Sequence, residues 1–439
     1  MNIILLSGGS GKRLWPLSNN IRSKQFIKIF RNEDETYESM IQRMYRQVRR
    51  IDPFAKVTIA TSKAQVSILH NQLGNDIGIS VEPCRRDTFP AIALATAYLH
   101  DVQNVSEDEA VVVCPVDPYV NADYFEAIGR LWKLAQSDGS SLNLMGINPT
   151  YPSEKYGYII PASKDTVSKV VAFKEKPDAA TAQKYIEQGA LWNSGVFAYK
   201  LKYVLKICKK IFGTCEHHAL LSNYENLTKI SFDYAVVEKE TDISVLRFSG
   251  QWEDLGTWNT LTEVMEENAI GNRIIMKNCE NTHVVNELDI PIICMGADDL
   301  VVAAGKDGVL VAKKEMSADI KSSVDQLEIG IRFAEKSWGD YCVIDVSPNC
   351  LTIKITITAH HRMSYHSHEM RNEVWTIISG SGYTVVDGIK RNVKPSDVIT
   401  IPKGCKHTIV ADTKLELIEM QLGEEITAND KQKFDLKLL

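Results

Sequence analysis

The first residues that could do chemistry follow an apolar run at the start of the chain, in LLSGGSGKRLWPLS at residues 5–18. The glycines Gly8, Gly9 and Gly11 have no side chains, so their backbone N–H groups can approach phosphate oxygens closely. The cations Lys12 and Arg13 follow directly and could balance the phosphate charge. The stretch therefore predicts a loop that binds a phosphorylated ligand.

Two familiar phosphate-binding motifs do not fit this loop. The nucleoside-triphosphatase loop needs a glycine where Leu6 stands and a Ser or Thr where Arg13 stands. The dinucleotide motif GxGxxG needs its last glycine where Leu14 stands. A glycine-rich turn with solvated cations remains an alternative. It is disfavoured because two more cations, Arg22 and Lys24, follow within a dozen residues.

Two aspartates are candidate ligands for Mg²⁺, which prefers one or two carboxylates together with phosphate and water oxygens. Asp117 follows the apolar run AVVVC, and Asp254 lies two residues after Trp252. An aspartate at the end of a strand is also a common turn or capping residue. For Asp117 taken alone, that structural alternative stays open.

A second group of candidate ligands lies in SYHSHEMRNEVWTIISG and PKGCKH. The spacing is H-x-H-x4-E through His366, His368 and Glu373, and His407 follows on a later run. Histidines one residue apart lie on the same face of a strand, so the four side chains can converge on one divalent metal. The arrangement resembles the cupin barrel. A polar strand face without a metal is the alternative.

The elements that must position these residues change along the chain. Up to residue 265, apolar runs such as NIILLS and AVVVCPVD alternate with helical patterns such as ETYESMIQRMYRQVRRI, which predicts an open α/β sheet. Residues 266–330 contain short β-like runs and a helical pattern, SADIKSSVDQLE, which predicts a small β linker module. Residues 331–439 are almost entirely strand-like, which predicts a β-sandwich or barrel.

Composition narrows the classes of function. The chain has 439 residues, of which 44% are hydrophobic and 24% charged, and its formal net charge of -6 argues against a general affinity for nucleic acid or anionic membranes. The apolar run at the start is short and lacks a basic n-region, so we expect a cytoplasmic protein without a membrane span. The nine cysteines contain no C-x-x-C pair and are expected to be reduced thiols.

Together these motifs resemble the sugar-phosphate nucleotidyltransferases, and most closely the long bacterial mannose-1-phosphate guanylyltransferases. GGSGKRLWPLSN and SKQF are similar to that family's GGSGTRLWPLSR and PKQF. Further similar pieces follow in the family's order: EPCRRDTFPAIALA, PVDPYV, EKYGYI, FKEKP, WNSGVF, FDYAVVEK and QWEDLGTW. The resemblance covers essentially the whole chain. It implies a Rossmann-like open mixed sheet, a β linker and a C-terminal cupin β-barrel.

The resemblance also implies a reaction in which GTP and mannose 1-phosphate give GDP-mannose and pyrophosphate with Mg²⁺. Arg13 and Lys24 would hold the triphosphate, while Asp117 and Asp254 would bind the metal. The implied nucleotide-binding residues are Gly8, Gly9, Gly11, Lys12, Glu82, Arg86 and Asp87, and the implied sugar-phosphate-binding residues are Gly157, Glu175, Lys176 and Asn193. A carboxylate such as Glu82 would accept hydrogen bonds from guanine, although uracil or thymine also offers an N–H donor.

Departures from the family pattern leave the specificity open. Lys12, Ser23, Asp87 and Pro118 stand where the family has Thr, Pro, Asn and His. Another nucleotide, or a modified hexose or heptose 1-phosphate, is therefore an alternative. A sensor that binds a sugar nucleotide without turnover is the non-enzymatic alternative. An exposed β linker and a barrel favour a homodimer.

The C-terminal domain resembles the type II mannose-6-phosphate isomerase, which is entered at KSWGDY and would need Zn²⁺ or another divalent metal. However, His366 and Val374 stand where the family has Gln and His, and Ser396 replaces a cupin glycine. The family's arginine-bearing tail is also replaced by EEITANDKQKFDLKLL. We therefore expect a metal site without isomerase activity, and keep the bifunctional enzyme as an alternative.

Overall fold

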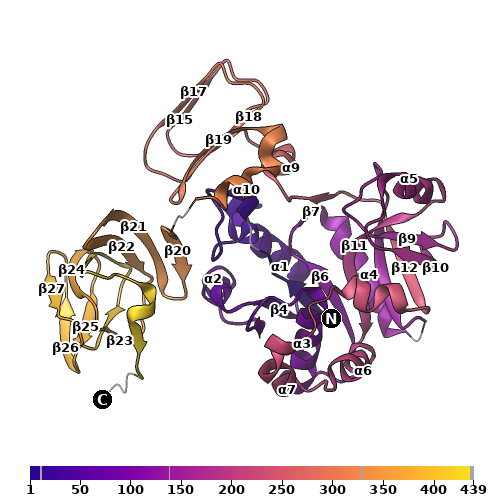
Figure 1. The fold of residues 1–439 in the computed structure, drawn as a ribbon, viewed down its shortest axis with the longest axis horizontal. Coiled ribbons are helices and arrows are strands. Elements are labelled where there is room, and N and C mark those ends of the chain that lie inside the picture. The colour runs from indigo at the N-terminus through magenta and orange to yellow at the C-terminus, as the bar shows by residue number, and fades with distance from the viewer. Residues whose placement is uncertain (10–11, 138, 328–329, 436–439) are drawn as a thin grey trace. The chain divides into compact units, whose positions relative to one another are not determined.

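The computed structural model describes residues 1–9, 12–137, 139–327 and 330–435 (Figure 1). Their contacts define two compact units. Unit 1 comprises Met1–Arg13, Ser23–Val66 and Asn75–Asn268, and unit 2 comprises Leu14–Arg22, Ser67–Gly74 and Ala269–Leu439. Two short segments from the first part of the sequence thus belong to unit 2. The division at residues 265 and 330 stays a prediction.

Unit 1 is built on one nine-stranded mixed sheet. Its strands are, in order, β5 (Gly78–Glu82), β4 (Lys56–Ser62), β1 (Asn2–Leu6), β6 (Ala110–Pro115), β11 (Leu191–Lys200), β8 (Leu142–Ile147), β12 (Ile243–Phe248), β10 (Val167–Lys174) and β9 (Tyr158–Pro161). The first four pair in parallel, whereas β11 is antiparallel to both β6 and β8. The predicted mixed α/β sheet is confirmed, but it is not open throughout: β9 also pairs with β11, so that β11, β8, β12, β10 and β9 close on themselves.

Helices pack on this sheet and complete its core. Those of unit 1 are α1 (Met40–Ile51), α3 (Thr88–Asp101), α4 (Ala122–Gln136), α5 (Ala179–Glu187), α6 (Leu201–Phe212), α7 (His217–Ser222), α8 (Phe232–Ala235) and α9 (Trp258–Glu263), and α2 (Val66–Leu73) lies almost wholly in unit 2. The helix predicted over residues 35–51 begins only at Met40. Ser39 caps it by accepting from the Gln42 amide, while residues 37–39 form β3 (Tyr37–Ser39) with β2 (Lys28–Arg31).

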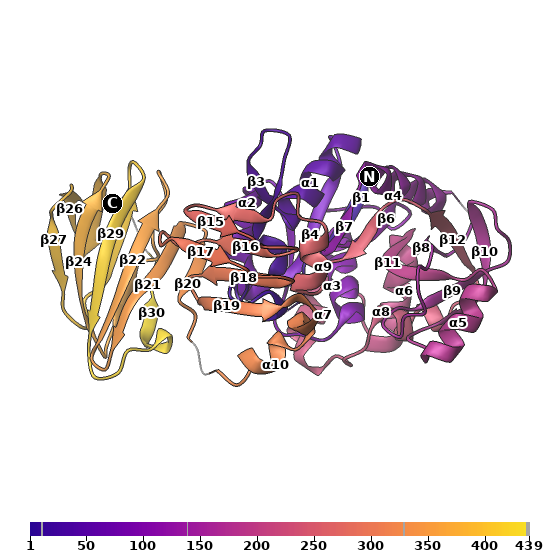
Figure 2. The ribbon, with the colours of Figure 1, turned by 90° about the horizontal axis from the view of Figure 1, so that it is seen from above.

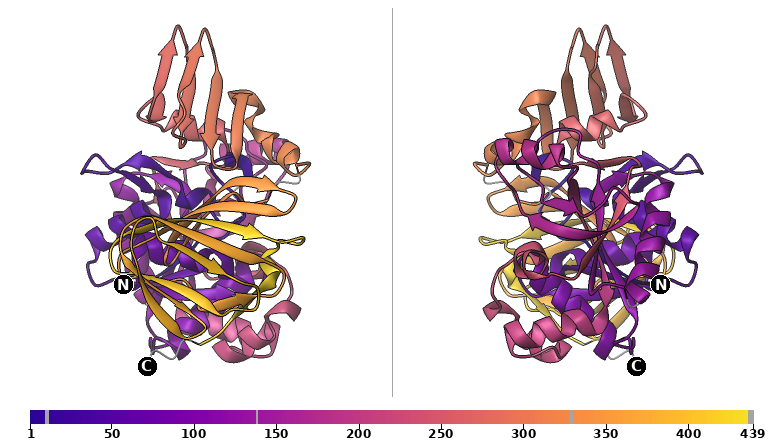
Figure 3. Two further views of the ribbon diagram at one scale, coloured as in Figure 1. Left: turned by 90° about the vertical axis from the view of Figure 1, so that its left-hand side faces the viewer. Right: turned by 90° about the vertical axis from the view of Figure 1, so that its right-hand side faces the viewer.

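The linker in unit 2, residues 269–313, winds as a solenoid of mostly parallel strands and is called the β coil below (Figure 3). One sheet contains β14 (Ala269–Gly271), β16 (His283–Asn286), β18 (Leu300–Gly305) and β19 (Gly308–Lys313), and the other contains β15 (Ile274–Lys277) and β17 (Ile292–Met295). Val284, Cys294 and Val302 form the core between the two sheets. From β14 to β18 the chain alternates between the two sheets, which explains why each apolar run is short, and β19 then returns antiparallel beside β18. The predicted helix that follows is shorter than its pattern, because α10 spans only Ile320–Val324.

The C-terminal part consists of two antiparallel sheets whose apolar faces share one core around Trp375 and Ile409 (Figure 2). One sheet contains β20 (Phe333–Lys336), β21 (Gly339–Ser347), β22 (Cys350–Ile357), β29 (Leu415–Leu422), β24 (Asn372–Ser379) and β27 (Val398–Ile401), and the other contains β26 (Ile389–Val393), β25 (Gly382–Val386), β28 (His407–Ala411), β23 (His366–His368) and β30 (Lys431–Lys433). The predicted cupin-like β domain is confirmed. Within the described ranges, no helix combines the length and apolarity needed to cross a membrane.

Candidate functional site

The two predicted metal-binding aspartates meet because two short strands pair. Strand β7 (Pro118–Val120) follows Asp117, and β13 (Trp252–Asp254) runs antiparallel to it, with Asp254 opposite Pro118. Lys24 Nζ lies 3.1 Å from Asp117 Oδ2 and 3.8 Å from Asp254 Oδ1. The structure thus gathers three predicted catalytic residues at the carboxyl end of β6, from parts of the sequence more than 90 residues apart.

Electrostatics around Asp254 reflect this convergence. The pKa of Asp254 is raised, chiefly because burial disfavours its charged form; Lys24 opposes this effect and the nearby Asp117 carboxylate adds to it. Arg13 adjoins the pair, since a Cβ at Gly256 would lie 3.6 Å from Arg13 Nη1 and 3.7 Å from Asp254 Oδ1. Both carboxylate side chains remain over 40% exposed. Their accessible hard oxygens fit the ligand preference of Mg²⁺.

A cavity of about 340 Å³ opens at the carboxyl ends of β1, β4, β5 and β6. Four predicted nucleotide-binding residues line it: Gly8, Gly9, Glu82 and Asp87. Gly9 has φ 123°, a backbone conformation that side chains disfavour. The Gly9 carbonyl accepts hydrogen bonds from Ser23 Oγ at 3.0 Å and Arg85 Nη2 at 3.1 Å. The side chains of Ser23 and Arg85, which lie outside the glycine loop in the sequence, therefore hold its described part in place.

The remaining nucleotide-binding predictions differ in placement. Gly11 lies outside the described residues. Neither Lys12, in a short 3-10 helix, nor Arg86 lines the cavity, whereas Arg85 does. Asp87 also accepts from the Thr88 amide and so caps α3. Arg86 was predicted because it matches the arginine of the family motif, and the sequence alone does not show which of two adjacent arginines faces the cavity.

Glu82 has a hydrogen-bond partner that the sequence reasoning missed. Tyr224 donates its hydroxyl to Glu82 Oε2 at 2.7 Å, which leaves Oε1 as an acceptor at the cavity. Burial raises the pKa of Glu82, while Tyr224 and Arg85 oppose that shift. Tyr224 follows α7, 142 residues later in the chain, and no motif marked it.

A second cavity, of about 220 Å³, shares Pro115 and Asp117 with the first. Gly157, Glu175 and Asn193, three of the four predicted sugar-phosphate residues, line it. Lys176 is not among the lining residues, but its Nζ donates to Glu175 Oε1 at 2.7 Å. The two cavities thus adjoin at Asp117, where a nucleotide and a sugar phosphate could meet.

Glycine is required at position 157 by a close approach. A Cβ on Gly157 would lie 2.5 Å from Glu175 Oε2 and 2.8 Å from the Phe173 ring. Glu175 is only 6% exposed, and its Oε2 has no hydrogen-bond partner among the residues that the structure describes. A buried acceptor without a donor is costly, so a ligand hydroxyl that donates to Glu175 would be favoured.

Asp233 is a residue of this cavity that the sequence reasoning did not select. Asn193 Nδ2 donates to Asp233 Oδ1 at 2.7 Å, and burial together with the charge of Glu175 raises the pKa of Asp233 to about 7. Its segment, FDYAVVEK, was recognised only as part of the family resemblance. The aromatic ring of Tyr156, another lining residue, packs edge-on against Trp252 at a centroid distance of 5.6 Å.

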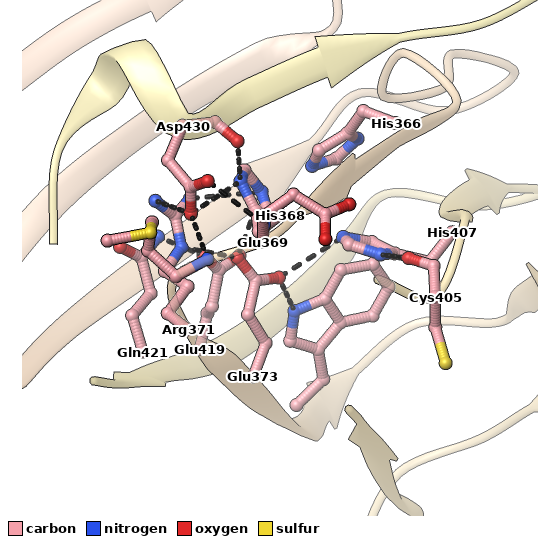
Figure 4. A network of polar contacts seen from close by, with 12 residues as sticks. His366, His368, Glu369, Arg371, Glu373, Cys405, His407, Glu419, Gln421 and Asp430 are labelled. Atoms are coloured by element: carbon pink, nitrogen blue, oxygen red, sulfur yellow. Dashed lines mark hydrogen bonds and ion pairs between the residues drawn. The ribbon is translucent and has the colours of Figure 1, made fainter. Parts of the chain in front are cut away.

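The four predicted cupin ligands are brought together on one side of β23, β24 and β28 (Figure 4). One ligand atom from each of His366, His368, Glu373 and His407 lies within 4.8 Å of the others. All four residues are at most 2% exposed. Burial lowers the pKa of His366 to about 2 and that of His368 to about 4, so both rings are neutral at pH 7.

Backbone carbonyls orient the three imidazoles. Each Nδ1 lies within hydrogen-bond distance of a carbonyl oxygen: His366 of Ser364 at 2.6 Å, His368 of Asp430 at 3.1 Å and His407 of Cys405 at 3.0 Å. Because a carbonyl can only accept, each Nδ1 carries the proton and each Nε2 keeps its lone pair, which at His368 accepts a hydrogen bond from Arg371 Nη2 at 3.0 Å. This is the arrangement that protein metal sites use to present Nε2 ligands. The donor set fits a divalent transition metal.

Comparisons with known proteins agree with this geometry. The family described as Nucleotidyl transferase matches residues 2–269, and the family described as Mannose-6-phosphate isomerase C-terminal matches residues 329–436. A mannose-1-phosphate guanylyltransferase from Salmonella montevideo is 28% identical over 99% of this chain and 98% of its own. The xanthan biosynthesis protein XanB from Xanthomonas campestris pv. campestris (strain B100) is 30% identical over 98% of this chain and 97% of its own.

One solved structure carries the comparison into three dimensions. The crystal structure named mannose-1-phosphate geranyltransferase from Thermus thermophilus has a TM-score of 0.63 and 28% sequence identity. The match covers 74% of this chain and 98% of that one.

Proposed function

The chain belongs to the nucleotidyl transferase family, and on that premise we propose that it transfers a guanylyl group from GTP to mannose 1-phosphate, which releases pyrophosphate and forms GDP-mannose. The observation that carries this proposal is the convergence of Lys24, Asp117 and Asp254 where two cavities adjoin. The product would supply the synthesis of polysaccharides or glycoconjugates, in line with the name of the XanB relative.

The residues divide the reaction between them. The triphosphate lies against the glycine loop, where Arg13 and Lys24 neutralise the charge that develops on the departing pyrophosphate. Asp117 and Asp254 hold Mg²⁺, which supplies further positive charge at the phosphate oxygens. Glu82 Oε1 accepts from the N–H edge of guanine. The protein thus acts by positioning both substrates and by balancing their charge.

The second cavity receives the sugar phosphate. Glu175 Oε2 accepts from a sugar hydroxyl, and Asn193 with Asp233 fixes the orientation of the same ring. Lys176 balances the phosphate charge. The pKa of Lys176 is raised. Burial alone would lower this pKa, but the hydrogen bond to Glu175 and the charge of Glu175 outweigh that effect. Lys176 is therefore a cation at any pH near neutrality.

The test of this proposal is pyrophosphate release with Mg²⁺ for five nucleoside triphosphates against a panel of sugar 1-phosphates. Release should be highest for GTP with mannose 1-phosphate. A peak at another pair would keep the nucleotidyl transfer and assign the changed specificity to departures such as Lys12 and Asp87. Binding of GDP-mannose without release from any pair would favour the sensor.

Replacing Asp254 separates catalysis from binding. Asp254→Asn keeps the size of the side chain but removes the carboxylate, so kcat should fall by about a hundredfold or more. The dissociation constant of GTP, measured by calorimetry without metal, should change by less than about threefold, because the base cavity does not include Asp254. Asp123→Asn, on α4 and remote from both cavities, is the control. Equal losses of turnover and affinity would exclude the assigned role.

We also propose that the cupin domain binds one divalent metal, Zn²⁺ or a similar ion, through His366, His368, Glu373 and His407. Elemental analysis of the purified protein should give about one metal per chain, and His368→Ala with His407→Ala should reduce it to near zero. The exposed His361 offers a matched control, His361→Ala, which should retain the metal. A full metal content in the double variant would reject the site.

A metal site in the cupin domain does not by itself imply that the domain catalyses isomerisation. The match to the isomerase family shows the domain, but His366 and Val374 depart from the pattern that the resemblance implies. We propose that the metal-loaded protein does not interconvert mannose 6-phosphate and fructose 6-phosphate. The double histidine variant should retain pyrophosphate release, since none of its residues lines either cavity of unit 1. Interconversion that disappears in that variant would instead establish the bifunctional enzyme.

A homodimer is proposed through the β coil of unit 2. Ile275 and Ile293 are partners in the parallel pair β15–β17, and with Met295 they form an outward apolar patch, each about 60% exposed. Such a patch can cover its own copy across a two-fold axis. Ile293→Glu should convert the dimer to a monomer in analytical ultracentrifugation. Phe54→Ser removes an isolated exposed ring in unit 1 and should leave the dimer intact.

A further inference from the structure

A nine-residue segment, Leu14–Arg22, separates two residues that the proposed function places on the triphosphate. Arg13 precedes the segment directly, and Lys24 follows it after Ser23. Both flanks belong to unit 1, whereas the segment itself belongs to unit 2. Whatever holds this segment therefore acts, through the chain, on both cations.

The segment ends in a buried ion pair. Arg22 is 7% exposed, and its guanidinium binds Glu287 with two parallel hydrogen bonds, Nη1 to Oε2 at 2.8 Å and Nη2 to Oε1 at 2.9 Å. Arg22 also donates to the Leu17 carbonyl within the segment. The sequence places Arg22 among the cations that follow the phosphate loop, which suggests a role in phosphate binding. The structure corrects that interpretation, because its guanidinium is committed to Glu287, just after β16.

Other contacts fix the rest of the segment. Asn19 Oδ1 accepts from the amides of Ile21 and Arg22, and Asn19 Nδ2 donates to Asp307 Oδ2 at 2.7 Å. The Trp15 ring lies so close to Gly308 that a Cβ there would be 2.5 Å from it. Glu287 and Asp307 lie in turns of the β coil and Gly308 begins β19, so the coil holds the segment at its start, middle and end.

A bidentate arginine–carboxylate pair restricts the relative orientation of its two side chains as well as stabilising their contact, because both groups are planar. Catalysis by charge neutralisation needs its cations placed to within a fraction of an ångström. We propose that Arg22 and Glu287 are a positioning pair for nucleotidyl transfer, which fixes the Leu14–Arg22 segment and thereby places Arg13 and Lys24 on the triphosphate. This inference rests on the proposed function of those two cations.

The central test replaces Glu287 by Gln, which keeps the shape and removes the charge. In Glu287→Gln, kcat for pyrophosphate release should fall by about tenfold or more. The KM for the sugar 1-phosphate should stay within about twofold, since no residue of the segment lines that cavity. Arg22→Lys keeps the charge but loses the bidentate geometry, and should reproduce the same split; it also serves if the first variant folds poorly.

The chain offers a matched control in a second bidentate pair. Arg46 binds Glu38 through Nε at 3.0 Å and Nη2 at 2.7 Å, and Glu38 is buried, but neither residue lies in the segment. Glu38→Gln should lower the Tm about as much as Glu287→Gln while leaving kcat within about twofold of the wild type. A fall of kcat that merely follows the Tm in both variants would overturn the inference.

Two further readouts separate this inference from the proposed function. The double variant Arg22→Lys with Glu287→Gln should lose no more activity than the worse single variant, because one interaction is removed in each case. Hydrogen exchange should show faster exchange of the Leu17 and Ser18 amides in Glu287→Gln than in Glu38→Gln.

If the wild-type protein releases no pyrophosphate, the proposed function fails. Weaker GTP binding in Glu287→Gln, but not in Glu38→Gln, would then still support the positioning role. Normal turnover in a variant with a loosened segment would refute it. Where the wild type releases no pyrophosphate, normal GTP affinity in that variant would refute it.

Discussion

The proposed chemistry depends on one cation held between two carboxylates. Asp117 and Asp254 repel each other, and partial burial adds to the cost of the Asp254 charge, as the raised pKa of Asp254 shows. The ammonium of Lys24, within 4 Å of both, offsets that repulsion. The sheet makes this meeting possible: β6 delivers Asp117, the β7–β13 pair delivers Asp254, and a short helix after Ser23 delivers Lys24. Each element contributes to the site only because the other two bring their side chains to the same place.

The two polar centres of the protein solve opposite electrostatic problems. The nucleotidyl site must accept highly charged phosphates, and its two proposed metal-binding carboxylates, Asp117 and Asp254, stay over 40% exposed. The cupin centre buries its ligands completely, and backbone carbonyls fix the protons on Nδ1. Burial keeps the His366 and His368 rings neutral, which suits metal binding but would not serve a site that neutralises phosphate.

The sequence predicted those features that are local. Gly8 and Gly9, Asp117 at the end of an apolar run, and the His366–His368 spacing each carry their signal within a few residues. The structure added partners that are distant in the chain: Tyr224 for Glu82, Asp233 for Asn193 and Glu287 for Arg22. Composition and periodicity hold no information about such pairs. The start of α1 was mispredicted for a related reason, because residues 37–39 pair with β2 although their own pattern is helical.

A loop that binds phosphate through bare backbone cannot hold itself in place. Glycines contribute no side-chain contacts, and they cost more conformational entropy to order than other residues. Rigidity must therefore come from neighbours, and the structure supplies it at successive points. Gln25 holds Ser7, and Ser23 and Arg85 hold the Gly9 carbonyl. Ser23 stands where the related family has proline, which has no hydroxyl to donate. Ser23 departs from the family motif, but its hydroxyl helps to hold the described part of the loop at Gly9.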